Sequence, residues 1–178
     1  MAKPLLIVLC GLPGAGKSSL SRELARRLGA LRWDKDELRE LLFPGARVRH
    51  DRALNDACME LLYAALTRAF VETRIVILDG RPFTESAQRT RVREAAKQAG
   101  AAPAFVLCSA QLTVLRERIS GSSHVARDRD EALLERLMAR SEPFEGDAIR
   151  VDTSVLGPED AASFCVNELR ARGLIVLS

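Results

Sequence analysis

Residues 11–18 read Gly-Leu-Pro-Gly-Ala-Gly-Lys-Ser and match the pattern G-x-x-x-x-G-K-[ST] at every fixed position. Glycines in such a loop let backbone N–H groups turn inward around phosphate oxygens, in conformations that residues with a Cβ disfavour. Lys17 is then expected to reach the β- and γ-phosphates from the surface of the loop, and the Ser18 hydroxyl to ligate Mg²⁺. The predicted triphosphate-binding residues are Gly11, Pro13, Gly14, Ala15, Gly16, Lys17, Ser18 and Ser19.

A second polar cluster, Asp34-Lys35-Asp36-Glu37-Leu38-Arg39, follows a short apolar run. A carboxylate here could accept the proton of a substrate hydroxyl, and Arg39, one helical turn later, could hold an anionic substrate group. The alternative is a helix start, in which Asp34 or Asp36 is the N-cap and acidic side chains offset the helix dipole. Capping accounts for one aspartate but not for two.

A third cluster begins with Asp79, Gly80 and Arg81, directly after the apolar residues 75–78. Asp79 is placed to hold Mg²⁺ directly or through water, and Arg81 could face the substrate. The alternative is an ordinary turn in which Gly80 supplies a permissive backbone and Arg81 is solvated. We favour the functional interpretation, because an aspartate that ends a buried strand beside a phosphate loop has few structural reasons to be there.

The elements that position these clusters follow from the alternation of apolar runs and helical patterns, which is typical of βαβ units and a parallel sheet. Predicted strands span 5–10, 30–33, 75–78, 104–108 and 149–151; predicted helices span 17–28, 36–42, 51–73, 85–99, 112–119, 130–141 and 158–172. Ligands of open parallel sheets gather at the carboxyl ends of the strands, where these clusters fall. We therefore expect a single three-layer α/β domain over residues 1–178, with a five-stranded parallel sheet and helices on both faces.

Composition excludes few binding partners but indicates the cellular location of the protein. The chain has 178 residues, a formal net charge of +3 and 29% charged residues of both signs, which is an ordinary surface rather than a nucleic-acid-binding stripe. Its four cysteines form no C-x-x-C pair and lie in apolar stretches, as small hydrophobic residues do. No signal peptide is visible, and no apolar run approaches the roughly 20 residues needed to span a bilayer. We expect a cytoplasmic location and no membrane partner.

Several motifs of other nucleotide-binding classes are missing. The chain contains no N-K-x-D for reading guanine, no D-x-x-G switch sequence and no L-S-G-G-Q-like segment. It is also too short to add the helical lid domain of a ring-forming ATPase. A compact phosphotransferase remains.

The loop at 11–18, the Asp-x-x-Arg of Asp36 and Arg39, and Ile-Leu-Asp-Gly at 77–80 resemble the small P-loop kinases grouped with zeta toxins and the kinase domain of polynucleotide kinases. Members are sometimes labelled AAA-domain ATPases, and adenylylsulfate kinase, gluconate kinase and chloramphenicol phosphotransferase are more distant relatives. The resemblance covers nearly the whole chain. It implies ATP as donor, Asp36 as base for the accepting hydroxyl and Arg39 in contact with substrate.

Two departures lie on the substrate side. A second aspartate stands at 34, so the base could be Asp34, and Arg81 stands where many relatives carry a smaller polar residue. The family phosphorylates acceptors as different as sugars, antibiotics and nucleic-acid ends, so the resemblance implies no one acceptor. Residues 151–153 resemble the loop that borders adenine in similar kinases; a strand that ends in a capping Asp-Thr is the alternative.

A cationic segment resembles the lid of such kinases, which closes over the transferring phosphoryl group and excludes water. An exposed basic helix is the alternative. We expect the lid over about 119–131 and select Arg118 and Arg127 as acting residues, while His124 is expected to be solvated. The segment's charged and titratable residues are Arg116, Arg118, His124, Arg127 and Arg129.

The sequence thus predicts transfer of the γ-phosphoryl group of Mg-ATP to a hydroxyl of a small molecule. The predicted catalytic residues are Lys17, Asp36, Arg118 and Arg127; the predicted substrate-binding residues are Asp34, Arg39, Asp79 and Arg81; the predicted metal-binding residues are Ser18 and Asp79. One alternative is a 5′-hydroxyl polynucleotide kinase, although 4% aromatic residues leave little for base stacking. Another is a nucleotide-binding regulator that hydrolyses ATP slowly and phosphorylates nothing. The oligomeric state stays open.

Overall fold

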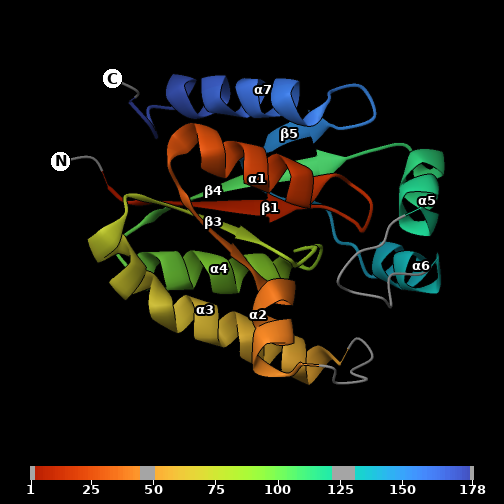
Figure 1. The fold of residues 1–178 in the computed structure, drawn as a ribbon, viewed down its shortest axis with the longest axis horizontal. Coiled ribbons are helices and arrows are strands. Elements are labelled where there is room, and N and C mark those ends of the chain that lie inside the picture. Colours follow the sequence, from red (N-terminus) through yellow and green to blue (C-terminus); the bar gives the residue numbers. More distant parts are fainter. Residues whose placement is uncertain (1–2, 45–50, 122–130, 177–178) are drawn as a thin grey trace.

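A computed structural model describes residues 3–44, 51–121 and 131–176. Its centre is a five-stranded parallel sheet with the strand order β2-β3-β1-β4-β5, so the expected α/β class is confirmed (Figure 1). The strands are β1 (Leu5–Cys10), β2 (Leu31–Asp34), β3 (Ile75–Asp79), β4 (Ala102–Ser109) and β5 (Ile149–Asp152).

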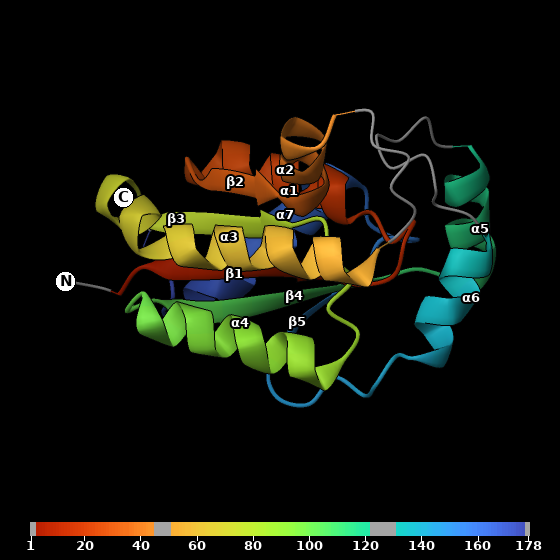
Figure 2. The ribbon, with the colours of Figure 1, turned by 90° about the horizontal axis from the view of Figure 1, so that it is seen from below.

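Helices cover both faces of this sheet (Figures 1 and 2). One face carries α1 (Lys17–Leu28) and α7 (Pro158–Ala171), and the other carries α3 (Arg52–Glu72) and α4 (Ser86–Gln98). The short α2 (Lys35–Leu42) continues directly from β2, while α5 (Leu112–Ser120) and α6 (Glu131–Ala139) lie beyond the carboxyl ends of the strands. The expected lid falls mostly on 122–130, which lie outside the described residues.

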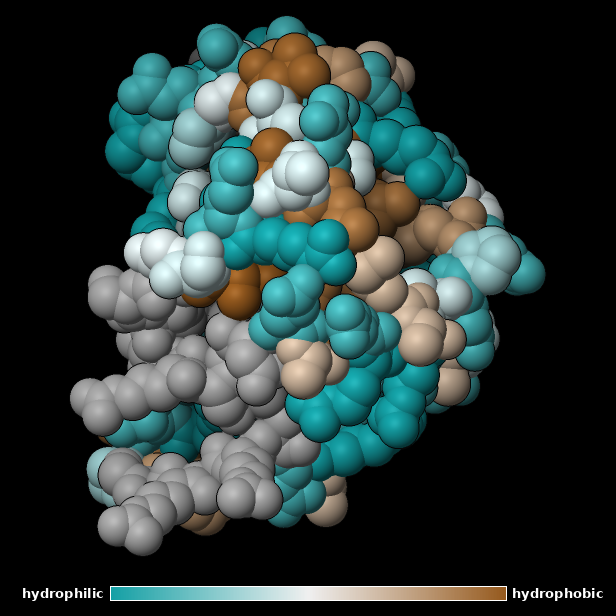
Figure 3. Space-filling model, turned by 90° about the vertical axis from the view of Figure 1, so that its right-hand side faces the viewer, coloured by the Kyte–Doolittle hydropathy of each residue, from teal (hydrophilic) through white to brown (hydrophobic). Residues whose placement is uncertain are grey.

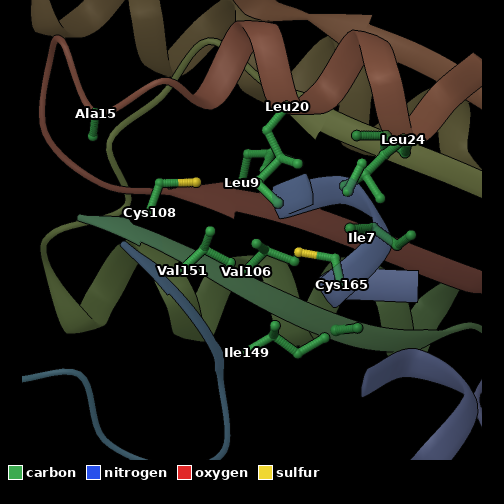
Figure 4. Packing of buried hydrophobic residues seen from close by; sticks show 14 of the residues in the cluster. Ile7, Leu9, Ala15, Leu20, Leu24, Val106, Cys108, Ile149, Val151 and Cys165 are labelled. Carbon is green, nitrogen blue, oxygen red and sulfur yellow. The ribbon is translucent and has the colours of Figure 1, made fainter. Parts of the chain in front are cut away.

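Two apolar layers fix the sheet between these helices. All six residues of β1 are buried, as in a central parallel strand covered on both faces. Leu9, Val106 and Leu20 belong to the layer under α1 and α7 (Figure 4). On the other face, Val8 and Val76 belong to the layer that includes residues of α3 and α4. These layers hold the strands in place and so fix where the carboxyl end of each strand lies.

Most element boundaries lie within one residue of those expected from the sequence. The largest shift among the strands is in β4, which begins two residues early because Ala102 and Pro103 pair with Leu5 and Leu6. The described part of the chain contains no helix with the length and apolar character that crossing a bilayer requires.

Candidate active site

Residues 11–18, hereafter the P-loop, connect β1 to α1 at the carboxyl end of the sheet. Gly11, Gly14 and Gly16 have φ values of +133°, +79° and +75°, which side chains with a Cβ rarely adopt. A Cβ on Gly11 would stand 2.2 Å from the carbonyl oxygen of Cys108, so even a small side chain is excluded there. The Gly11 N–H donates to Pro82 O at 2.9 Å and ties the P-loop to the segment after β3.

Lys17 was expected at the surface of the loop, and that expectation is wrong. The residue is only 7% exposed, and its Nζ donates to Gly11 O at 2.7 Å and to Leu12 O at 2.9 Å. The loop carbonyls fold around the ammonium group because a buried cation needs hydrogen-bond acceptors. Lys17 therefore presents its charge inside the loop that would receive the phosphates.

Asp34 and Asp36 have different structural roles. Asp34 is the N-cap of α2, and its Oδ1 accepts a 2.8 Å hydrogen bond from the Asp36 N–H. The Asp36 carboxylate lies 2.7 Å from Lys35 Nζ and 3.5 Å from the guanidinium of Arg39, and the residue is 3% exposed. Helix capping therefore accounts for Asp34 but not for the position of the Asp36 side chain.

Asp79 lies at the end of β3 and is fully buried. Its Oδ2 accepts hydrogen bonds from Ser21 Oγ at 2.7 Å and from Arg32 at 3.3 Å, and its Oδ1 accepts one from the Gly80 N–H at 2.7 Å. Arg32 also pairs with Asp34, the residue opposite Asp79 in the register of β2 and β3. A single guanidinium group thus bonds to two aspartates that the sheet places side by side.

Burial and the neighbouring carboxylates both act on the pKa of Asp34. Burial, followed by the nearby charges of Asp79 and Asp36, raises the pKa of the Asp34 carboxyl group. The hydrogen bond from the Asp36 N–H and the charge of Arg32 act in the opposite direction. The ends of β2 and β3 therefore carry two buried aspartates that share Arg32.

The N-terminal turn of α3 completes the site on the side of α2. Asn55 Oδ1 accepts hydrogen bonds from Lys35 Nζ at 2.8 Å and from Arg39 at 3.2 Å. Arg81, after β3, pairs with Asp56 Oδ1 at 2.6 Å. The consecutive residues Asn55 and Asp56 thus place Arg39 and Arg81 against the same turn of α3, and the substrate-binding role of both arginines stays a prediction.

Arg118, at the end of α5, is turned towards the P-loop. Its guanidinium donates to Gly14 O at 3.1 Å, and to Oγ1 and O of Thr153 at 2.9 and 2.8 Å. Thr153 Oγ1 lies 3.3 Å from Ala15 O, so the loop after β5 is fastened to the P-loop. Asp152 Oδ1 accepts from the Ser154 N–H at 2.9 Å, in agreement with the structural alternative for this segment. Arg127, His124 and Arg129 lie outside the described residues.

A cavity of about 260 Å³ opens beneath the P-loop, beside the segment after β3. Phe83, Phe144 and Leu115 supply much of its apolar wall. Arg89 is 2% exposed and holds two sides of the cavity together, because it donates to Phe83 O at 3.0 Å and to Pro143 O at 2.8 Å. Figure 3 shows this end of the molecule, where hydrophilic residues make up much of the described surface.

A family model described as an AAA domain matches residues 6–146. The chain belongs to the AAA domain family. The resemblance that the sequence indicated, to P-loop kinases that carry this label, is confirmed together with the fold.

Solved structures similar to this AAA domain include kinases. A candidate kinase from Chloroflexus aurantiacus J-10-fl has a TM-score of 0.74 and 25% identity, and the match covers 96% of this chain and 98% of that one. The APS kinase of Mycobacterium tuberculosis, solved with AMPPNP and APS, has a TM-score of 0.71 and 19% identity over 96% and 99% of the two chains. At that identity the second match shows the fold alone.

A shikimate kinase from Paracidovorax citrulli (strain AAC00-1) is 38% identical to this AAA domain over 94 residues. The match covers 51% of each protein, so the chain spans about half the length of this curated relative.

The donor set of this AAA domain fits Mg²⁺ with few protein ligands. Ser18 offers a hydroxyl at the start of α1, whereas Asp79 Oδ2 already accepts from Ser21 and Arg32, which favours contact through water. Among the described residues, no group of three or more His, Cys, Asp or Glu could hold a metal ion. Mg²⁺ suits such a site because it keeps several waters and binds through substrate phosphates.

Sequence reasoning missed Ser21, Arg32, Asn55 and Asp56. A signal existed for Arg32, because residues two apart on a strand share a face and Arg32 precedes Asp34 by two. No signal existed for Asn55, since one polar residue in a long helical pattern is ordinary.

Proposed function

We propose that this protein transfers the γ-phosphoryl group of Mg-ATP to a hydroxyl group of a small molecule. Membership of the AAA domain family and the kinase neighbours support a phosphotransferase. The observation that carries the proposal is the division between the two aspartates: Asp34 caps α2, while Asp36 is held by Lys35 and Arg39 at the edge of the sheet that bears the P-loop.

Each residue then has a distinct task. Lys17 neutralises charge on the β- and γ-phosphates, and Ser18 would hold Mg²⁺, which supplies further charge neutralisation when bound. Asp36 accepts the proton of the attacking hydroxyl. Arg39 and Arg81 orient the acceptor, and Arg118 steadies the P-loop through Gly14 O. In a loose transition state, positioning and charge neutralisation supply most of the rate enhancement.

The experiment is incubation with γ-labelled Mg-ATP and a panel of hydroxyl compounds. The panel contains sugars, hydroxy acids such as gluconate and shikimate, and an oligonucleotide with a 5′-hydroxyl group. We expect label on a small hydroxyl compound with the parent protein and with Lys97→Ala, a variant of an exposed lysine, but not with Lys17→Ala. Label found only as inorganic phosphate would indicate a regulator, and label on the oligonucleotide would indicate a polynucleotide kinase.

A further inference from the structure

Three cationic side chains converge on the side of the site formed by α2 and α3. The side chains of Lys35, Arg39 and Arg81 are 5%, 11% and 13% exposed. Their carboxylate partners among the described residues are Asp36, whose side chain is 4% exposed, and Asp56, whose side chain is 47% exposed. Lys35 and Arg39 therefore share one buried carboxylate and Arg81 pairs with a half-exposed one, although buried charges are normally matched.

Asn55 lies between two of these cations, Lys35 and Arg39. Its Oδ1 accepts from both Lys35 and Arg39, so a neutral amide dipole receives two positive donors where a full negative charge would be a stronger partner. Burial lowers the pKa of Lys35; Asp36 opposes this shift, and the positive charges of Arg39 and Arg81 add to it. The positive charges of Arg39 and Arg81 therefore both act on Lys35.

The pair between Arg81 and Asp56 is the weakest link of the cluster. Asp56 is half-exposed and lies in the first turns of α3, where its other oxygen is 3.9 Å from Arg52 Nε. Arg52 also pairs with Glu85 at 2.9 Å, so Asp56 keeps a cationic neighbour when Arg81 is released. Because the Asp56 side chain is half-exposed, water can solvate its carboxylate, so a better anion can replace Asp56 at Arg81.

We propose that the acceptor is a small hydroxyl compound that carries an oxyanion, and that this oxyanion binds to Arg39 and Arg81 and displaces Asp56 from Arg81. A carboxylate, sulfate or phosphate has this chemistry, because each offers paired oxygens to the planar fork of a guanidinium group. The description of the ligand as an acceptor rests on the proposed function. Because Asp36 lies 3.5 Å from Arg39, the hydroxyl to be phosphorylated belongs a few bonds from the oxyanion.

The test is a calorimetric titration of the protein with sodium sulfate, in the presence of saturating Mg-AMPPNP so that the P-loop is occupied. We expect sulfate to bind one site per chain, and Arg39→Gln and Arg81→Gln each to weaken that binding at least tenfold, as expected for a lost charge-assisted hydrogen bond. Arg68→Gln, an exposed arginine of the same α3 helix, is the matched control and leaves the affinity unchanged.

The titration of Asp56→Asn is the decisive experiment because this substitution is expected to increase the affinity for sulfate. Removal of the competing carboxylate releases Arg81, so sulfate binds severalfold more tightly, an outcome that damage to the fold does not produce. No binding of sulfate by the nucleotide-loaded protein, or unchanged or weaker binding by Asp56→Asn, would overturn the proposal. Matching titrations with acetate and inorganic phosphate then show which oxyanion the site prefers.

The titration involves no phosphoryl transfer, so its result is independent of the kinase assay. Sulfate binding with the expected variant pattern, together with label found only as inorganic phosphate in that assay, would retain the anion site and reject the kinase. Transfer to a neutral hydroxyl compound, with no sulfate binding, would retain the kinase and reject the anion site.

Discussion

The ammonium group of Lys17 lies within the P-loop, bonded to two of its carbonyl oxygens. Lys17→Ala removes the charge that would neutralise the transferring phosphoryl group, so we expect kcat to fall roughly 10²-fold or more. The two carbonyl groups can accept hydrogen bonds from water in the variant, and the melting temperature changes little. Measurement of turnover and thermal unfolding on the same preparation checks both. Full turnover in a folded Lys17→Ala protein would contradict the kinase proposal.

Asp36→Asn tests the proposed base. Asparagine cannot take the hydroxyl proton, so we expect kcat to fall by roughly 10²-fold. The melting temperature also falls, because Lys35 and Arg39 lose their buried carboxylate. Adding Lys35→Met to Asp36→Asn should restore stability but not activity. Recovery of turnover in that double variant would show that the carboxylate only balances Lys35.

Asp34→Asn gives a pH test with a defined sign. Because the pKa of Asp34 is raised above 3.8 in the folded protein, the folded state holds this proton more tightly than the unfolded state. The parent protein therefore loses a contribution to stability as pH rises through the Asp34 pKa, and Asp34→Asn does not. Asparagine keeps the cap. Urea unfolding at pH 4 and pH 7 should show the variant gaining stability relative to the parent at the higher pH; a constant difference would contradict this.

At the scale of elements, Gly80 positions the junction between β2 and α2. Its φ is +89°, and a Cβ there would stand 2.6 Å from both Asp34 Oδ1 and the backbone nitrogen of Lys35. Gly80→Ala must shift that junction, so we expect a loss of stability on the order of 1–3 kcal/mol and a fall in kcat.

Gly100→Ala is the matched control for Gly80→Ala. Gly100 also has a positive φ, +69°, but a Cβ there would meet nothing within 4 Å. Gly100→Ala introduces backbone strain without displacing a neighbouring atom, so we expect kcat to stay at the parental value. Equal losses of kcat in both variants would show that the contact of Gly80 with β2 and α2 does not position the site.

The sequence predicted elements best where the chain marks both ends. The apolar run of β1 stops at Gly11, and the leucine repeat of α1 stops at Gly29, so both elements were predicted to the residue. The start of β4 was missed because Ala102 and Pro103 have low strand propensity and join the sheet by pairing with β1.

The site was predictable where one motif spans it and unpredictable where distant segments meet. The P-loop follows from eight consecutive residues. Which of Asp34 and Asp36 caps α2 could not be predicted, because both stand at positions that favour a cap and only the fold fixes the choice. Asn55 meets Lys35 only through the packing of α2 on α3, which no local pattern records.

At the scale of the whole molecule, the reactivity of the four cysteines measures how well the folded core excludes solvent. Cys10, Cys58, Cys108 and Cys165 are all buried, and burial raises the pKa of Cys108 and Cys165 to about 12. The thiolate is the reactive form, so we expect no reaction with an aromatic disulfide reagent at pH 8 in the folded protein and reaction of all four thiols in denaturant. Rapid labelling of a folded sample would contradict this.

The hydrogen bond from the Gly11 N–H to Pro82 O joins the first residue of the P-loop to the residue that follows Arg81. Because peptide units are stiff, a displacement of the P-loop on binding a nucleotide reaches the backbone beside Arg81 within two residues. Coupling between two ligands is reciprocal, so whatever factor the nucleotide imposes on acceptor affinity, the acceptor imposes on nucleotide affinity. We therefore expect nucleotide and acceptor binding to be coupled, so that the saturation curve of either ligand depends on the concentration of the other.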